Sequence, residues 1–382
     1  MNKRITTGMA KVTDLTRAGR LSEAAALIQS LLQGRAEPNP QDSTANEAAI
    51  DGVFTRLDSG APDKTAEAQP RRNEKRAGGL AETLQRMAAG RVSSRATQPV
   101  PVVDVPDGAK FLSLSHASAQ GQCDYRLYVP SKSATSPRPV VVMLHGCTQS
   151  PEDFAAGTGM NALAEEFGCL VVYPAQPTRA NVQKCWNWFR PEDQLRANGE
   201  PALIAGVTRD VLIAYNGDPA QVYIAGLSAG AAMALLVAEA YPEIFHAVGV
   251  HSGLPIGAAR DIPSAFSAMR SGSKGVVRKN PVPTIIFQGS ADATVHPSNG
   301  PAIQSQAVAT FAGLTPATKA GKSGGGRTFK RTDHKRDDGR SMVEYWQVDG
   351  VGHAWAGGQA TGTYTDPSGP DASREMLRFF MQ

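Results

Sequence analysis

The chain has 382 residues, of which 41% are hydrophobic, and a formal net charge of +4 at pH 7. This length accommodates one large α/β domain with extensions, or two domains. The modest charge, without a dense basic stripe interleaved with aromatic residues, argues against a nucleic-acid-binding protein, and the lack of an apolar run of about 18 residues argues against a transmembrane helix.

The first 100 residues differ in composition from the rest. Charged residues such as Lys11 and Asp14 interrupt the N-terminus, so no apolar core of a secretory signal is visible and a cytoplasmic location is favoured. Residues 1–34 are expected to form an N-terminal helical segment. Its apolar stripe either packs on the main domain, which we prefer, or binds a partner or granule surface. Residues 35–100 have few large apolar side chains, so we expect a low-complexity, disordered linker.

From residue 101 onward, short apolar runs alternate with helix-forming stretches. The run 139–144 is continuously apolar, which is typical of a strand buried on both faces of a sheet. The alternation predicts a mostly parallel central sheet flanked by helices, so we assign 101–382 to one α/β domain. The expected strands are 111–114, 125–129, 139–144, 169–174, 221–225, 247–250, 284–287, 328–334 and 341–348, and the expected helices are 151–167, 201–216, 231–238 and 371–381.

A serine stands at the sharpest predicted turn. The pentapeptide 226–230 reads Gly-Leu-Ser-Ala-Gly and lies between an expected strand and an expected helix. This is the context of the G-x-S-x-G nucleophile elbow, in which small residues let strand and helix approach closely and the serine hydroxyl stands above the sheet. The sequence therefore predicts Ser228 as a nucleophile; the alternative is a glycine-rich turn with an incidental serine.

A serine hydroxyl needs a base within hydrogen-bond reach, and the base needs an orienting acid. Such groups collect where parallel strands end. Asp292 follows the strand 284–287 and His353 follows the strand 341–348. The chain order Ser, Asp, His is that of the α/β-hydrolases, so we predict Ser228, Asp292 and His353 as a triad. The alternatives are a turn carboxylate and a surface-loop histidine.

Backbone amides must also be aimed at the negative charge that develops on an attacked carbonyl oxygen. One is expected from Ala229, directly after the serine. The other is expected from Cys147, in the loop that begins His145-Gly146-Cys147 after the strand 139–144. Gly146 lets this backbone turn, so the amides of Cys147 and Ala229 are the predicted oxyanion hole.

Four ordered motifs together resemble a known esterase family. They read LHGCTQ at 144–149, CWNWF at 185–189, GLSAG at 226–230 and GHAW at 352–355. They are similar to the catalytic domains of short-chain-length polyhydroxybutyrate (PHB) depolymerases, relatives of feruloyl and acetylxylan esterases. Over about 105–380, the resemblance implies an α/β-hydrolase fold, ester hydrolysis by the triad and an aromatic-lined cleft. Secreted members carry a signal peptide and further domains, whereas a location inside the cell is expected here.

The resemblance also bears on the aromatic residues and cysteines. His145, Trp186, Trp188 and Trp355 are candidate substrate-binding residues, with core packing as the alternative for the tryptophans. The resemblance suggests a disulfide between Cys147 and Cys185, which requires Cα atoms within about 7 Å; Cys123 and Cys169 are expected to be free thiols. No metal or organic cofactor is expected, because no cluster has ligand spacing.

Three functions follow from these observations. The leading hypothesis is a serine esterase acting on short-chain hydroxyacyl esters or PHB-type oligomers or polymer, through an acyl-enzyme on Ser228. A feruloyl or acetylxylan-type esterase is the alternative within enzymes. A binding module on an α/β-hydrolase scaffold is the alternative outside them. The expected partners are the ester substrate and a polymer or granule surface, and no nucleic acid.

Overall fold

The fold is that of a computed structural model, which describes residues 101–382. The helical segment predicted for 1–34 and the linker predicted for 35–100 lie outside the described residues. Within the described part, no helix is both long enough and apolar enough to cross a membrane.

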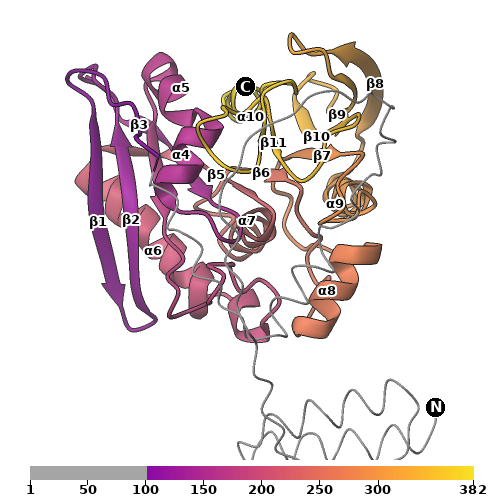
Figure 1. Ribbon diagram of the computed structural model, residues 1–382, viewed down its shortest axis with the longest axis horizontal. Helices are drawn as coiled ribbons and strands as arrows, with labels where there is room; N and C mark the ends of the chain where they lie inside the picture. Colours follow the sequence, from indigo (N-terminus) through magenta and orange to yellow (C-terminus); the bar gives the residue numbers. More distant parts are fainter. Residues whose placement is uncertain (1–100) are drawn as a thin grey trace, which may run out of the picture. The chain divides into compact units, whose positions relative to one another are not determined.

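A ten-stranded sheet forms the centre of the described domain, in the order β1-β2-β4-β3-β5-β6-β7-β10-β9-β8 (Figure 1). The strands from β4 to β10 in this order run parallel to one another, while β1, β2, β8 and β9 pair antiparallel at the two sides. The predicted α/β class with a mostly parallel sheet is confirmed. The strands are β1 Lys110–Ser118, β2 Gly121–Val129, β3 Arg138–Leu144, β4 Leu170–Pro174, β5 Gly217–Leu227, β6 Ala247–His251, β7 Thr284–Gly289, β8 Thr315–Lys322, β9 Thr328–Lys335 and β10 Ser341–Val348.

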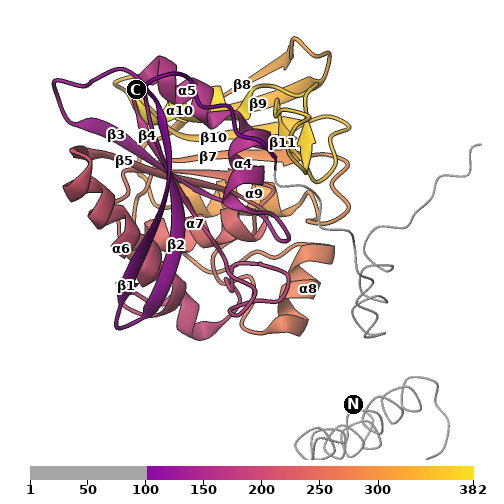
Figure 2. The same cartoon turned by 60° about the vertical axis from the view of Figure 1, so that its left-hand side comes forward.

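Helices cover both faces of this sheet. Figure 2 shows α4, α5 and α10 on one side and α6 and α7 on the other. A short parallel pair, β11 with β12, lies outside the main sheet. The helices are α4 Pro151–Thr158, α5 Met160–Phe167, α6 Gly199–Ala214, α7 Ala229–Ala240, α8 Ile262–Ser271, α9 Asn299–Val308 and α10 Ala372–Phe380, with a 3-10 turn η1 at Pro191–Gln194; β11 is Trp355–Ala356 and β12 is Thr365–Asp366.

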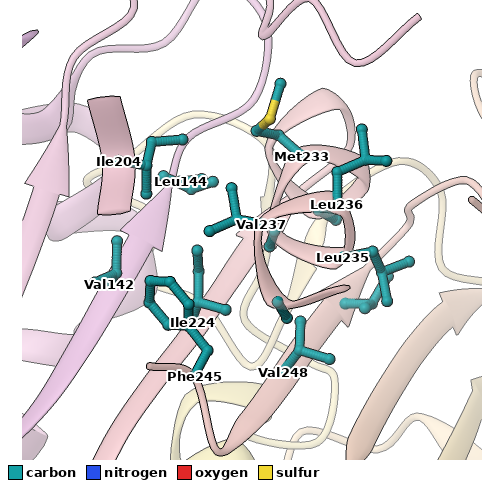
Figure 3. Packing of buried hydrophobic residues seen from close by; sticks show 14 of the residues in the cluster. Val142, Leu144, Ile204, Ile224, Met233, Leu235, Leu236, Val237, Phe245 and Val248 are labelled. Atoms are coloured by element: carbon teal, nitrogen blue, oxygen red, sulfur yellow. The ribbon is translucent and has the colours of Figure 1, made fainter. Parts of the chain in front are cut away.

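Alternation along β3 divides the core between the two faces. Val142 belongs to the cluster that contains Ile224 and Val237 of α7 (Figure 3). Its neighbour Val141 belongs to the other cluster, with Phe154 of α4. Because successive strand side chains point to opposite faces, a strand covered by helices on both sides must be apolar throughout. This is the physical reason for the continuous apolar run in the sequence.

The predicted helix 151–167 is instead two helices. Gly159 separates α4 from α5 with a φ of 63°, and its amide donates to the Ala155 carbonyl, which ends α4. Glycine adopts this left-handed conformation without the strain of a Cβ atom, so the chain changes direction there.

Six elements were not predicted: the short η1, β11 and β12, and the longer α8, α9 and β8. Both helices have ten residues; α8 buries only Ala265 and Ala268, and α9 has a weak apolar stripe, so few large apolar residues mark either helix in the sequence. Strand β8 is almost wholly exposed and holds no large apolar residue. It forms because its backbone pairs with β9 at the side of the sheet, and such pairing leaves no alternating pattern in the sequence.

Candidate active site

Ser228 lies at the junction of β5 and α7, with φ 58° and ψ −120°. A Cβ atom on Gly226 would overlap the Gly230 backbone, and one on Gly230 would overlap the Leu144 carbonyl. Glycine is therefore required at both positions. The Ser228 amide donates to the His251 carbonyl at 2.9 Å, which ties the turn to the end of β6. The local geometry is that of a strained strand–turn–helix with the serine at its apex.

His353 and Asp292 form a hydrogen-bonded pair. The Nδ1–H of His353 donates to Oδ2 of Asp292 at 2.8 Å, which leaves Nε2 as the free nitrogen. Asp292 is 3% exposed, and its Oδ1 accepts the amides of Thr294 and Val295 at 2.9 Å. Burial alone would raise the pKa of Asp292, but the hydrogen bond and charge of His353 and these amides lower it below its usual value. Asp349, a second carboxylate only four residues before His353, instead accepts from the Thr328 hydroxyl.

Strand order explains how residues so distant in sequence reach one edge. Strands β5, β6, β7 and β10 are successive parallel neighbours, so their carboxyl ends meet. Ser228 follows β5, Asp292 follows β7 and His353 follows β10. No hydrogen bond joins the Ser228 hydroxyl to the imidazole of His353 in this structure. The predicted acid and base are thus hydrogen-bonded to each other, whereas the predicted nucleophile and base are not, and contacts of the latter kind often tighten only when substrate binds.

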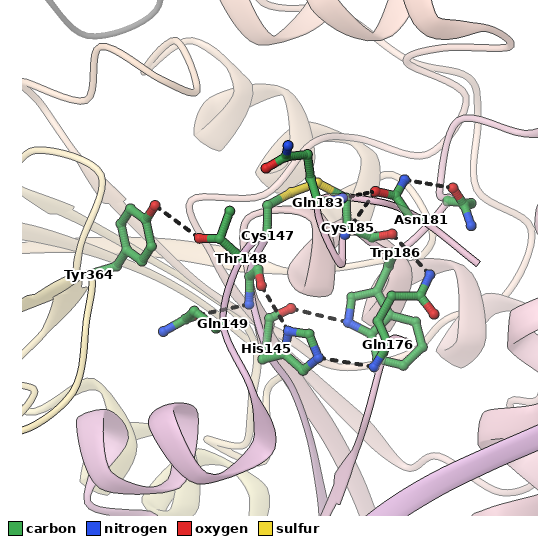
Figure 4. The surroundings of a disulfide bond; sticks show 12 residues. His145, Cys147, Thr148, Gln149, Gln176, Asn181, Gln183, Cys185, Trp186 and Tyr364 are labelled. Carbon is green, nitrogen blue, oxygen red and sulfur yellow. Dashed lines mark hydrogen bonds between the residues drawn. A yellow bond between two sulfur atoms is a disulfide. The ribbon is translucent and has the colours of Figure 1, made fainter. Parts of the chain in front are cut away.

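One side chain and one backbone carbonyl hold the backbone of the loop after β3 (Figure 4). The Gly146 amide donates to Gln149 Oε1 at 2.9 Å, and the Thr148 amide donates to the Gln183 carbonyl at 2.6 Å. Within the described part of the chain, the Cys147 amide between them has no hydrogen-bond acceptor. The Ala229 amide, in the first turn of α7, also has no acceptor within the helix. Both predicted oxyanion donors are thus amides without an acceptor among the described residues.

The buried side chain of His145 supports this loop through hydrogen bonds. Its Nδ1–H donates to the Gly146 carbonyl at 2.8 Å, while its Nε2 accepts the Gln176 amide and its carbonyl accepts the Trp186 indole N–H, both at 3.1 Å. Burial lowers the pKa of His145 to about 4, so the ring is neutral at neutral pH. The side chain acts through the Gly146 backbone and has no surface for a substrate.

The disulfide between Cys147 and Cys185 is present, with Cα atoms 4.2 Å apart. It joins the loop after β3, which carries the predicted oxyanion amide of Cys147 and which we call the oxyanion loop, to the loop that carries Trp186. Cys123 and Cys169 are buried free thiols, and burial raises the pKa of each to about 12.

The three tryptophans follow the core-packing alternative and do not line the expected aromatic cleft. Trp186, Trp188 and Trp355 are 2%, 5% and 1% exposed, respectively, so they pack in the core, as does His145. The physical reason is visible at Trp355, whose indole N–H donates to Ser373 and whose ring stacks on His251. These large aromatic rings therefore pack beneath the loops of the predicted site and hold them in place.

Sequence reasoning missed three residues that contact the predicted site. Gln288 Nε2 donates to Asp292 Oδ2 at 3.2 Å. The His251 ring stacks between Phe287 and Trp355 and accepts the Ala356 amide. Tyr364 meets the His353 ring edge-on, with centroids 6.4 Å apart. The first two stand at the carboxyl ends of predicted strands, which was the available signal; nothing local marked Tyr364.

Within residues 101–382, no group of three or more His, Cys, Asp or Glu side chains is arranged to hold a metal ion. The chemistry that this site can perform is nucleophilic attack by a serine, assisted by an imidazole and a carboxylate.

Known proteins resemble this chain over much of its length. The family described as "Esterase PHB depolymerase" matches residues 123–330, more than half of the chain. The poly(3-hydroxyalkanoate) depolymerase C of Paucimonas lemoignei is 34% identical over 259 residues, covering 63% of this chain and 58% of that protein. The poly(3-hydroxybutyrate) depolymerase of Ralstonia pickettii is 28% identical over 254 residues, covering 60% and 51%. The chain therefore spans about half the length of the curated relatives it matches.

Other esterases resemble shorter or more divergent parts. Feruloyl esterase B of Thermothelomyces thermophilus is 33% identical over 153 residues, covering 39% of this chain and 51% of that protein. Among solved structures, an acetyl xylan esterase from Aspergillus awamori superposes with a TM-score of 0.56 at 20% identity, covering 72% of this chain and 98% of the other. This likeness shows a shared α/β-hydrolase fold.

Proposed function

The chain belongs to the esterase PHB depolymerase family, and we propose that it is a serine esterase that hydrolyses carboxylic esters through an acyl-enzyme on Ser228. We assign this activity to the domain formed by residues 101–382. The observation that carries the proposal is the pairing of His353 with a buried, ionised Asp292 at the sheet edge that also carries the strained serine.

In this proposal, His353 Nε2 removes the hydroxyl proton of Ser228 as Oγ attacks the ester carbonyl carbon. Asp292 holds the imidazole in the required tautomer and stabilises the imidazolium that forms. The amides of Cys147 and Ala229 stabilise the negative carbonyl oxygen. His353 then returns the proton to the leaving alcohol. A water molecule attacks the acyl-enzyme with the same base, and the acid leaves as Ser228 is restored.

For the substrate, we propose short-chain hydroxyacyl esters, as oligomers or as a polyester surface. The two relatives named as depolymerases match 63% and 60% of the chain, whereas the feruloyl esterase matches 39%. A feruloyl or acetylxylan-type activity is the second candidate. A panel of p-nitrophenyl esters, hydroxybutyrate oligomers, feruloyl esters and acetylated xylan distinguishes the two by the ratio of kcat/KM values.

The decisive test is Ser228→Ala. It is expected to abolish nearly all ester turnover and fluorophosphonate labelling, leaving only the roughly 10³–10⁴-fold rate over water that binding and an oxyanion hole supply. The thermal unfolding midpoint should stay close to that of the unaltered protein. Ser305→Ala, on the exposed side of α9, is the matched control. Activity within tenfold of the unaltered protein, or labelling that survives the change, would contradict the proposal and favour a binding module.

A further inference from the structure

The chain makes a loop directly after His353. We call residues 357–364, between the paired strands β11 and β12, the strap. The strap returns to the site because the Trp355 amide donates to the Tyr364 carbonyl at 2.7 Å. This bond brings Tyr364 back beside the histidine that lies eleven residues earlier.

Tyr364 stands between the proposed base and the oxyanion loop. Its ring meets the His353 ring edge-on, at 75° between planes. Its hydroxyl lies 3.2 Å from Oγ1 of Thr148, the residue that follows Cys147 (Figure 4). The Tyr364 side chain thus contacts both the predicted base, His353, and the loop that carries the predicted oxyanion amide.

Both hydroxyl-bearing residues have strained backbones. Tyr364 has a φ of 53° and Thr148 a φ of 68°, a left-handed conformation that is strained for a residue other than glycine. Such strain persists where the surroundings impose it, and it gathers at functional sites. Tyr364 is also 45% exposed, unlike the three buried tryptophans nearby. Core packing therefore does not account for its position.

A buried carboxylate holds the strap and the oxyanion loop together. Asp153 Oδ1 accepts the Thr363 amide at 2.9 Å, and its Oδ2 accepts Gln149 Nε2 at 2.9 Å. Gln149 Oε1 in turn accepts the Gly146 amide. One side chain thus fixes the residue before Tyr364 and the loop that carries Thr148, which presets the separation of the two hydroxyls.

We propose that the hydroxyls of Tyr364 and Thr148 form a subsite for an oxygen atom in the alcohol half of the ester. The inference deepens the proposed esterase function and rests on it. His353 delivers a proton to the leaving alcohol, so a side chain that touches this ring flanks that half of the substrate. When one hydroxyl donates to the other, the pair keeps one free O–H donor for an acceptor. The class of substrate is an ester whose alcohol is itself a hydroxyacid ester or carboxylate.

The test uses two esters with the same acyl group and alcohol skeletons of equal length. Beyond the scissile oxygen, the alcohol half of methyl 3-(butyryloxy)butanoate carries a second ester group, whereas that of 2-hexyl butyrate is purely alkyl, and butyrate release is measured for both. Tyr364→Phe keeps the ring and removes the hydroxyl. It is expected to lower kcat/KM for the oxygenated ester about 3- to 10-fold, the range for one hydrogen bond, and to leave the alkyl ester within about twofold. Thr148→Val should give the same pattern.

Tyr215→Phe, at the far end of α6, is the matched control and should change neither ester. Equal losses of kcat/KM on both esters would overturn the subsite and assign Tyr364 a purely structural role. Unchanged kcat/KM values on both esters would also overturn the subsite. If the unaltered protein hydrolyses neither ester and Ser228 resists fluorophosphonate, it is the esterase proposal that fails. The two failures are therefore distinguishable.

Discussion

His251 shows how burial sets the chemistry of a single side chain. Its ring lies between two aromatic rings, accepts the Ala356 amide at Nε2, and is 1% exposed. Burial, with a smaller contribution from the charge of His353, lowers the pKa of His251 to about 3. The ring is therefore neutral whenever the protein is folded near neutral pH, and it acts as an acceptor that fixes the segment after His353.

This shift predicts a loss of stability in acid. An unfolded histidine binds a proton near pH 6.5, whereas folded His251 binds none until about pH 3. Between these values the unfolded state holds more protons, so the free energy of unfolding falls as the pH falls, by about 1.4 kcal/mol per pH unit. Buried His145 adds a similar slope down to its pKa of about 4.

His251→Gln keeps an acceptor for Ala356 and removes the titrating ring. From pH 7 to pH 5, the variant should lose about 2 kcal/mol less unfolding free energy than the unaltered protein. Urea unfolding at the two pH values measures this difference. Unfolding at pH 8, where histidine is neutral in both the folded and the unfolded state, provides the reference free energy for each protein. An unchanged slope would mean that His251 titrates normally in the folded protein.

At the scale of elements, the disulfide connects the loop after β3 to the loop that precedes η1. Cys147 supplies a proposed oxyanion amide, and Cys185 precedes Trp186, whose indole donates to the His145 carbonyl. The bond and this hydrogen bond hold the same turn from two directions. Preorganised donors need such support, because a loop that must reorder during the reaction loses part of its electrostatic advantage.

Cys185→Ser tests this arrangement without altering the Cys147 amide. The bond closes a loop across a sequence separation of 38 residues, so its loss should lower the unfolding free energy by roughly 3–4 kcal/mol. We expect kcat to fall more than KM rises, since the oxyanion hole acts in the transition state. Thiol titration of the denatured, unreduced protein supplies the control: two free thiols are expected, and four would contradict the bond.

At the scale of the whole molecule, the sheet and the candidate site are complete between β1 and α10. Every residue assigned to the proposed chemistry lies between 145 and 364, and the family match lies between 123 and 330. The domain formed by residues 101–382 should therefore suffice for hydrolysis of soluble esters.

Deleting residues 36–95 is accordingly expected to leave kcat and KM for p-nitrophenyl butyrate within about twofold, since this composition supports no core of its own. The same comparison on a suspension of polyester granules reports any contribution to surface binding. A large fall in kcat on the soluble ester would place part of this segment in the catalytic domain.

Short-range signals made much of this architecture predictable from sequence. The continuous apolar run 139–144 predicted a strand covered on both faces, and the spacing of Gly226, Ser228 and Gly230 predicted the turn at the serine. Each depends on backbone preference or periodicity over a few residues, which the chain carries locally. The order of Ser228, Asp292 and His353 could be proposed because parallel strands end at one edge.

Contacts between distant segments decided the rest. Tyr364 meets Thr148 across 216 residues, and Gln149 meets the strap across 214; no local pattern marks such pairs. From the sequence alone, Trp355 could equally line a substrate cleft or pack in the core. Its contacts with His251 and with Ser373 of α10 place it in the core. The sequence by itself determined the fold class, the nucleophile turn and the candidate triad. Only the tertiary structure decided which rings are buried and which hydroxyls face the base, because burial and pairing depend on how whole elements pack.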